Sequence, residues 1–283
     1  MFLIYIKVIK MNIDTELLGI ARKVVGETAG FLRDAFYDED LEQIVGYGAG
    51  GDTTRKIDLL AEKYIIDLLK NTGLDLMIIS EERGEVKLSD KPRYIAVIDP
   101  LDGSLNYVSK IPLAAVSLVF YSVEKPFLTK ALAGSIANVF LKEQYSFDQK
   151  HVYLNGAIVN PRERRFNGLI SIYTENPYFI QKIRYIVEKY FNSKVKFRTL
   201  GSASIEAIYA CINRIDLFIH NTGKLRNFDV AGSIEIAYRL SVDALKLDET
   251  PLNNIRVDKI TMIPSLGIGL HLRELIKKLK NSS

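Results

Sequence analysis

The sequence contains no tryptophan, three histidines and one cysteine among its 283 residues. A single cysteine cannot form an internal disulfide, and such cysteine usage is typical of a cytoplasmic protein. Cys211 lies in an apolar helical pattern, which favours a buried thiol over a nucleophile. His151, His220 and His271 lack metal-ligand spacing, so we expect each to be a surface or packing residue.

The sequence also lacks a long apolar run and a strong excess of either charge. Residues 1–9 are apolar except for one lysine, too short a stretch to span a bilayer, and no cleavage site follows them. We expect residues 1–10 to be a short extra strand or a start codon assigned too early. Lys and Arg number 38 and Asp and Glu 34, a net charge of +4, and the basic run 162–165 predicts a solvated loop. We therefore expect neither nucleic acid nor a membrane as a partner.

The chain is 48% apolar and 25% charged, which is typical of a globular protein with a substantial core. In the first half, helical periodicity predicts helices over 15–34 and from about residue 55, with a mobile Gly-rich loop over 46–51. Branched apolar runs with short connections predict an antiparallel sheet. Its strands would cover residues 76–80, 94–98, 113–121 and 128–140.

The second half alternates between strands and helices, which favours a more parallel sheet. The expected elements are a strand over 168–173, helices over 177–191 and 202–213, a strand over 215–219 and a helix over 229–240. No Pro/Gly/Ser linker separates the halves, so we expect residues 1–150 and 151–283 to pack tightly as one unit, with the boundary near 140–165. The fold class is α/β, with α+β layering.

Acids follow two of the predicted strands. Glu81 and Glu82 come directly after strand 76–80, and Asp99 comes directly after strand 94–98. Acids at a strand end are held by the core and still reach solvent, and such oxygen ligands suit a hard cation such as Mg²⁺. We therefore expect the N-terminal half, residues 1–150, to carry a metal site.

The turn from Asp99 to Ser104 has features that could focus its acids. Pro100 fixes φ and Gly103 permits a sharp turn, so that Asp99, Asp102 and the Leu101 carbonyl can point toward one place. Neighbouring carboxylates repel unless a cation lies between them. The alternative is that Asp-Gly here is ordinary turn chemistry.

Two segments carry a family resemblance. Ile98 to Asn106 resembles the first signature of the inositol monophosphatase family, and Asn227 to Gly232 resembles the second. Together with Glu81-Glu82 and Lys56-Ile57-Asp58, the similarity runs from about residue 15 to the C-terminus. The archaeal branch, whose members often act on both inositol monophosphate and fructose 1,6-bisphosphate, is the most similar. The resemblance implies an αβαβα sandwich of the sugar phosphatase type, with an antiparallel first sheet and a mixed or parallel second sheet.

The resemblance also implies a site with two or three Mg²⁺ ions. Carried over by position, the metal ligands would be Glu81, Glu82, Asp99, the Leu101 carbonyl, Asp102 and Asp229. Asp58 and Ser104 would be the catalytic pair that orients the attacking water, with Glu81 assisting, although family members usually carry Thr where Ser104 stands. The alternative for Asp58 is an exposed acid in the first turn of a helix.

The substrate contacts implied by the resemblance are Gly103, Ser104, Gly201, Ser202, Arg226 and Asp229. The backbone N–H groups of Gly103 and Ser104 would cradle the phosphate if a helix begins there. Thr222 stands where inositol phosphatases place a glutamate, and Phe228 stands where a Trp is common. Lys224 or Arg226 would bind a second phosphate, as a bisphosphatase needs, or would instead pair with surface acids.

The implied function is Mg²⁺-dependent hydrolysis of inositol 1-phosphate, fructose 1,6-bisphosphate or both, by direct attack of water. The alternatives are a 3′-phosphoadenosine 5′-phosphate phosphatase and a regulatory binding protein on the same fold. The partner would be a small phosphate ester, and the family resemblance implies a homodimer.

Overall fold

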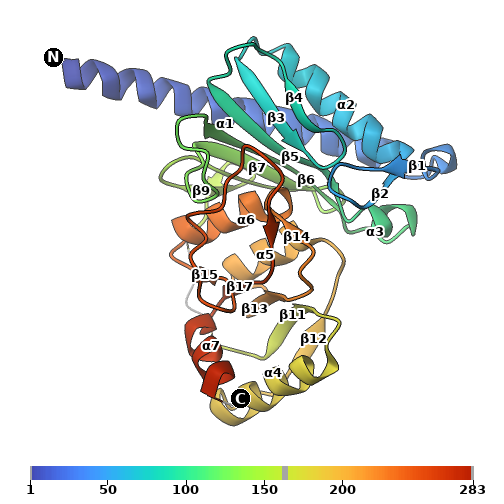
Figure 1. The fold of residues 1–283 in the computed structure, drawn as a ribbon, viewed down its shortest axis with the longest axis vertical. Helices are drawn as coiled ribbons and strands as arrows, with labels where there is room; N and C mark the ends of the chain where they lie inside the picture. The colour runs from blue at the N-terminus through green and yellow to red at the C-terminus, as the bar shows by residue number, and fades with distance from the viewer. Residues whose placement is uncertain (1, 161–164, 282–283) are drawn as a thin grey trace.

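The computed structural model describes residues 2–160 and 165–281, with side chains from residue 15 onward. The elements stack in five layers, α, β, α, β, α, with the larger sheet above the smaller one in Figure 1. Helices α1 and α2 cover the outer face of the larger sheet, α5 and α6 lie between the sheets, and α4 and α7 cover the smaller sheet. The predicted layered α/β fold is confirmed.

The larger sheet has eight strands in the order β10-β9-β8-β7-β6-β5-β3-β4. Every neighbouring pair is antiparallel except β3 and β5, which run parallel. The strands are β3 (Leu76–Ser80), β4 (Gly84–Lys87), β5 (Tyr94–Asp102), β6 (Ala115–Ser122), β7 (Ala133–Asn138), β8 (Glu143–Phe147), β9 (Val152–Leu154) and β10 (Ala157–Ile158).

The predicted strand over 128–140 is shorter than expected, because β7 begins only at Ala133. The preceding residues turn away from the ladder: the Leu128 N–H donates to the Ile255 carbonyl at 2.9 Å, and the Lys130 N–H donates to the Phe127 carbonyl at 2.9 Å. Their backbone groups are thus satisfied outside the sheet, which an apolar sequence pattern does not reveal.

Helix α1 (Phe2–Asp34) shows that the expected extra strand over residues 1–10 and the helix start near residue 15 are wrong. Residue 1 lies outside the described part. Residues 2–14 contain neither Pro nor Gly, so nothing in them stops a helix. With α2 (Lys56–Lys70), α1 buries a continuous apolar face on the sheet. Its fully buried residues include Leu17, Ala21, Val25 and Leu32.

The smaller sheet has the order β12-β11-β13-β17-β15, and it is mixed as expected. Strand β11 (Leu169–Tyr173) pairs in parallel with β12 (Lys196–Arg198) and β13 (Leu217–His220), while β17 (Leu266–Gly269) is antiparallel to β13 and to β15 (Ala244–Leu245). The helices of this half are α4 (Pro177–Tyr190), α5 (Ala203–Cys211), α6 (Asn227–Arg239) and α7 (Leu272–Asn281).

Two small two-stranded sheets complete the fold. β1 (Ile44–Tyr47) pairs with β2 (Thr53–Arg55), and β14 (Leu225–Arg226) pairs with β16 (Met262–Ile263). The Gly-rich stretch 46–51 therefore forms the end of β1 and the following turn, and not simply a loop. In that turn the Gly51 N–H donates to the Gly48 carbonyl at 2.9 Å.

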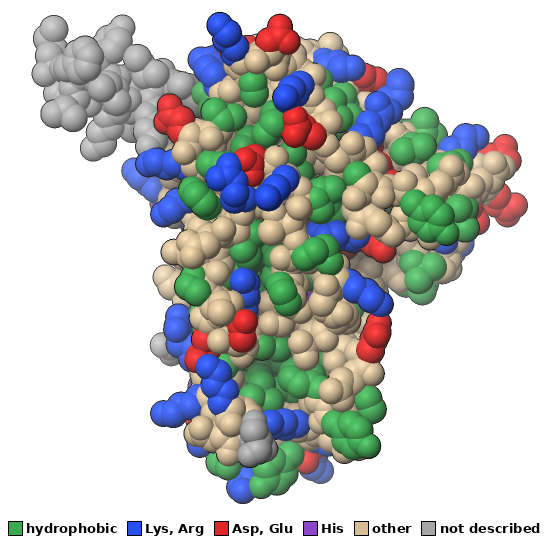
Figure 2. Space-filling model, viewed as in Figure 1, with side chains coloured by type: hydrophobic (Ala, Val, Ile, Leu, Met, Phe, Trp, Pro, Cys, Tyr) green, Lys and Arg blue, Asp and Glu red, His purple; other side chains and the backbone are tan. Residues whose placement is uncertain are grey.

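Single residues behave mostly as expected. Cys211 is buried between the layers, His151 and His271 are exposed, and His220 is buried against the ring of Tyr173. Of the run 162–165, only residue 165 is described, and it is exposed. None of the described helices combines the length and the apolarity that crossing a bilayer requires. On the face in Figure 2, basic and acidic side chains are interspersed.

We predict opposite effects for alanine at two helical glycines. A Cβ at Gly232 in α6 would lie 2.4 Å from Cδ1 of Ile136, whereas a Cβ at Gly19 in α1 meets nothing within 4 Å. Gly232→Ala should therefore lower the free energy of unfolding by about 1–3 kcal/mol through overpacking. Gly19→Ala should raise it by up to about 1 kcal/mol, because alanine favours the helix. Urea denaturation measures the free energy of unfolding of both variants. Changes of the same sign would contradict the packing of Gly232 against Ile136.

Candidate active site

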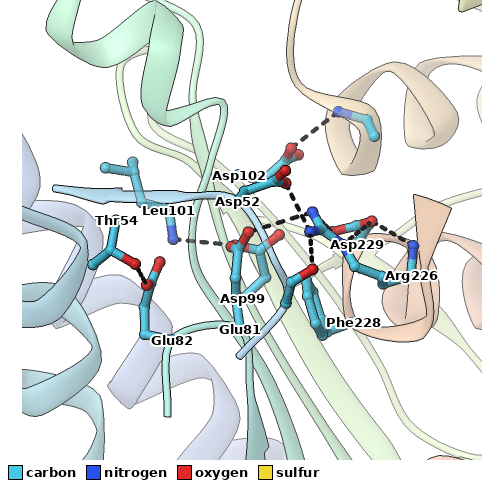
Figure 3. A network of polar contacts seen from close by, with 12 residues as sticks. Asp52, Thr54, Glu81, Glu82, Asp99, Leu101, Asp102, Arg226, Phe228 and Asp229 are labelled. Carbon is cyan, nitrogen blue, oxygen red and sulfur yellow. Dashed lines mark hydrogen bonds and ion pairs between the residues drawn. The ribbon is translucent and has the colours of Figure 1, made fainter. Parts of the chain in front are cut away.

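The acidic site lies where β3 and β5 end. Because these strands are parallel, Glu81 and Glu82 after β3 lie beside Asp99 on β5 (Figure 3). Asp99 is only 1% exposed. The sheet therefore brings together two acidic segments that are separate in the sequence.

A bulge shapes the end of β5. Asp99 pairs with Ser117 of β6 and Asp102 pairs with Ala115, so two residues of β5 face one of β6. Pro100 lies in this bulge, where a residue without an N–H costs no ladder hydrogen bond. Gly103 follows at φ 89°, and a Cβ there would lie 2.9 Å from the Gly201 carbonyl oxygen, so only glycine fits.

A short helix, α3 (Ser104–Val108), starts directly after Gly103. This start meets the condition set for the Gly103 and Ser104 N–H groups to face a phosphate. The turn is thus more than ordinary Asp-Gly chemistry, because it joins a bulge, a left-handed glycine and a helix start within five residues.

Asp58 and Asp229 are positioned by the same local pattern. Each is the third residue of a helix whose N-cap is an arginine, and each carboxylate accepts the N–H of that arginine, at 2.7 Å for Arg55 and 2.6 Å for Arg226. This contact satisfies one of the free N–H groups at the helix start. It fixes Oδ2 of each carboxylate, while Oδ1 of Asp229 accepts a long hydrogen bond of 3.5 Å from Nη2 of Arg226.

Asp58 is buried, so the alternative of an exposed helix acid is wrong. It is 3% exposed, and its Oδ1 atom is buried with no hydrogen-bond partner among the described residues. Burial, with Glu82 nearby, raises the pKa of Asp58 to about 7. An unpartnered buried acceptor is costly, so this oxygen fits a water or an ion that donates to it or binds it.

The remaining acids repel one another. Burial first, and the carboxylate of Asp229 second, raise the pKa of Glu81; burial and Glu81 likewise raise the pKa of Asp99. Burial raises the pKa of Asp229 to about 6, although Arg226 opposes the shift. A cluster of oxygen donors that resists ionisation by itself fits hard divalent cations.

Within the described residues, no three His, Cys, Asp or Glu side chains form a ready-made ion site. The guanidinium of Arg226 contacts two of the acids. Its Nη2 is 3.3 Å from Glu81 Oε1 and its Nε is 3.4 Å from Asp229 Oδ2 (Figure 3). These carboxylate oxygens are ligands of the kind that Mg²⁺ prefers, and the cationic side chain of Arg226 lies among them.

Asp102 joins the two halves of the chain. Its carboxylate accepts hydrogen bonds from the Ser202 hydroxyl at 2.6 Å, the Ala203 N–H at 3.1 Å and the Ser204 N–H at 2.8 Å. It therefore caps the start of α5, and most of the donors reach Oδ2. Among the residues that the structure describes, only the Ala203 N–H donates to Oδ1, so this oxygen has capacity for a further ligand.

Sequence reasoning missed Glu206 in α5. This fully buried glutamate accepts hydrogen bonds from the Ser171 and Tyr173 hydroxyls and from the N–H groups of Leu200 and Gly201. It holds segment 200–202 against Asp102. A glutamate in a helix carries no signal of its own, because only the fold brings these donors to it.

The other expected residues have identifiable partners. Lys224 is exposed and pairs with Glu175 at 2.6 Å, as the surface-acid alternative predicted. Glu82 accepts a hydrogen bond from the Thr54 hydroxyl. Phe228 packs under the guanidinium of Arg226, 4.9 Å from ring centroid to Cζ.

The family match and the curated relatives show the class of the protein, a phosphoric monoester hydrolase. The chain belongs to the inositol monophosphatase family, which matches residues 13–238. It is 40% identical to the inositol-1-monophosphatase of Aeropyrum pernix over 78% of this chain and 81% of that protein. It is 28% identical to the fructose-1,6-bisphosphatase/inositol-1-monophosphatase of Archaeoglobus fulgidus over 87% and 90% of the two chains.

Solved structures agree on the fold. The extragenic suppressor protein suhB from Bartonella henselae superposes with a TM-score of 0.77 at 19% identity, covering 95% of this chain and all of the other. An inositol monophosphatase-fructose 1,6 bisphosphatase superposes at 0.76 with 21% identity, covering 93% and 98%. At these identities the likeness concerns the fold.

We predict that Asp58→Asn changes the pH dependence of stability. Burial raises the pKa of Asp58 from the 3.8 of an ordinary aspartate to about 7 in the folded protein. The contribution of this carboxyl group to folding is therefore fully present below pH 4 and is lost as pH rises to about 7. Asparagine does not titrate and still accepts the Arg55 N–H. In EDTA, the free energy of unfolding of Asp58→Asn should rise relative to that of wild type by on the order of 2–4 kcal/mol between pH 4 and pH 8.

Urea denaturation across this pH range measures the effect. Asp67→Asn on the same helix is the matched control, because the side chain of Asp67 is 48% exposed and pairs with Lys63. Its stability should follow wild type within about 0.5 kcal/mol. Parallel curves for Asp58→Asn and wild type would show that burial does not raise the pKa of Asp58.

We also predict that Glu206→Gln destabilises the protein by about 2–4 kcal/mol. The glutamine amide would point its own N–H groups at O–H and N–H groups that now donate to the carboxylate. Glu188→Gln on the exposed face of α4 is the control and should stay within about 0.5 kcal/mol of wild type. Thermal or urea unfolding of both variants measures this, and a neutral Glu206→Gln would contradict the role of Glu206 in holding segment 200–202.

Proposed function

We propose that this protein is a Mg²⁺-dependent phosphatase of small polyol and sugar phosphates, with inositol 1-phosphate among its substrates. The observation that carries the proposal is the convergence of two buried acids, Asp99 and Asp229, with the half-buried Glu81, all three with raised pKa values. A binding protein would have no use for so costly a cluster. The 40% identical relative supports the substrate class.

The proposed ligands of two or three Mg²⁺ ions are Glu81, Glu82, Asp99, the Leu101 carbonyl, Asp102 through Oδ1, and Asp229. Bound Mg²⁺ would offset the charge of the phosphate dianion and lower the pKa of a coordinated water. The protein's own groups would position the reactants around it. Gly201 and Ser202, held by Glu206 and Asp102, would contact the alcohol part of the ester.

In the proposed reaction, the Asp58 Oδ1 atom accepts a hydrogen bond from the attacking water, and the Ser104 hydroxyl orients that water. The water oxygen forms a bond to phosphorus as the ester P–O bond breaks on the opposite side. The proton lost by the water ends on the departing alkoxide, so the products are an alcohol and inorganic phosphate. A pKa of about 7 suits Asp58 for accepting this hydrogen bond near neutrality.

The ion pairs of Lys224 and Arg226 favour a monophosphate ester as the primary substrate. Lys224 pairs with Glu175, and the Arg226 guanidinium is occupied by Glu81, Asp229 and Asp52. A second phosphate on the substrate would have to break these ion pairs. Thr222 in place of a glutamate supports a site that accepts more than one polyol. We also propose that the protein is cytoplasmic and forms a homodimer. The location rests on the free, buried Cys211, and the homodimer rests on the family resemblance.

We predict that the purified protein releases phosphate from inositol 1-phosphate with Mg²⁺ and that EDTA abolishes the release. Asp99→Asn should lower kcat at least about 1,000-fold, since it removes a ligand that the proposal shares between two ions. Asp67→Asn, near the opposite end of α2 from Asp58, should keep wild-type activity. Circular dichroism checks that both variants fold.

The same phosphate-release assay distinguishes the alternatives. Fructose 1,6-bisphosphate should be cleaved more slowly than inositol 1-phosphate, and 3′-phosphoadenosine 5′-phosphate more slowly still. A preference for the adenosine compound would replace the proposed substrate class. No release from any of the three would favour a binding protein, and full turnover by Asp99→Asn at saturating Mg²⁺ would refute the ligand assignment.

A further inference from the structure

Arg226 forms the positive centre of the acidic cluster. Its side chain is 10% exposed, and its ion pairs reach Glu81 at 3.3 Å and Asp229 at 3.4 Å. Among the described Lys and Arg residues, no other forms an ion pair with the acids at the ends of β3 and β5 or at the start of α6. The Coulomb field of Arg226 lowers the pKa values of Glu81, Glu82 and Asp99 against burial and mutual repulsion.

The guanidinium is held in this place from its other side. Nη1 donates to the Gly50 carbonyl at 2.9 Å and pairs with Asp52 Oδ2 at 2.7 Å, both in the turn between β1 and β2. A Cβ at Gly50 would lie 3.1 Å from Nη1, so glycine allows the close approach. The ring of Phe228 supports the flat face of the group.

The turn itself is fixed to the metal-site segment. The Ala49 N–H donates to the Glu82 carbonyl at 2.9 Å, and the Gly50 N–H donates to the Glu81 carbonyl at 2.8 Å. Arg226 is therefore held between a rigid turn and two carboxylates. Such an arrangement costs little ordering entropy, so the cation competes effectively with any other cation for these oxygens.

We propose that Arg226 is an internal counter-cation that competes with Mg²⁺ for Glu81 and Asp229 and thereby sets the metal affinity of the site. This inference rests on the proposed use of Mg²⁺. The carboxylate oxygens that would bind the ion are those that the guanidinium contacts, and one oxygen cannot serve both cations fully. The residue thus weakens metal binding while it stabilises the acids in the protein without metal.

The test is calorimetric titration of Mg²⁺ into EDTA-treated, dialysed full-length protein. Arg226→Met should bind the first ion about tenfold more tightly than wild type. Lys224→Met is the matched control. It removes the same charge at a position two residues from Arg226, and the ion pair of Lys224 is with Glu175. Its affinity should stay within about twofold, since exposed charges are screened.

A second measurement does not depend on binding heats. If Arg226 substitutes for the ion, the rise of the melting temperature on adding Mg²⁺ should be larger in Arg226→Met than in wild type and Lys224→Met. Arg226→Lys keeps the charge but cannot reach both carboxylates and the turn at once, so it should lie between the two. It also provides the comparison if Arg226→Met does not fold.

The outcomes separate this inference from the proposed function. No Mg²⁺ binding by wild type up to millimolar concentration would refute the magnesium role and the competition with it. Binding by wild type, with equal or weaker affinity in both Arg226 variants, would overturn the competition alone. An equal gain in Lys224→Met would show that net charge, and not the contacts of Arg226, sets the affinity.

Discussion

The structure depends on one electrostatic constraint, which is that several carboxylates are buried at the same point. Glu81, Asp99 and Asp229 each lose hydration on burial and each repel the others, so their pKa values rise. The surrounding fold must supply the free energy that keeps them together. The two sheets and the helices between them do so, since they form a continuous apolar core below the site.

Each acid is held by a different local device. The end of β3 presents Glu81, a bulge in β5 separates Asp99 from Asp102, and the start of α6 fixes Asp229. Backbone N–H groups satisfy part of each helix-start carboxylate and leave part available. The remaining oxygen capacity is what a phosphatase needs, because a cation bound there supplies charge that the reaction must place against a phosphate dianion.

The site also connects the halves of the chain. Asp102 from the first half caps α5 in the second, Arg226 reaches back to the β1–β2 turn, and Glu206 orders the segment that touches Asp102. Loss of packing between the sheets would therefore separate the acids from the segment proposed to contact the substrate. Stability and catalysis are coupled here through buried hydrogen bonds and not only through the apolar core.

The sequence by itself determined much of the molecule. Periodicity placed α2, β3, β11 and α4 closely, and it found the start of β5 but not its end at Asp102. The acids at the strand ends and the two signatures also predicted Glu81, Asp99, Asp102 and Asp229 as metal ligands. The sequence pattern failed for residues 2–14 and 128–132, where mostly apolar residues broken by single polar ones do not distinguish helix, strand and turn.

Only the tertiary structure decided how these groups meet. It buried Asp58, engaged Arg226 with Glu81 and the Gly50 carbonyl, and gave Glu206 its donors. Some of these contacts join residues 35, 145 and 176 positions apart, and a single sequence shows no covariation that would pair them. Local patterns fix local backbone, whereas the charge balance of a buried site is set by neighbours that the chain brings together only when it folds.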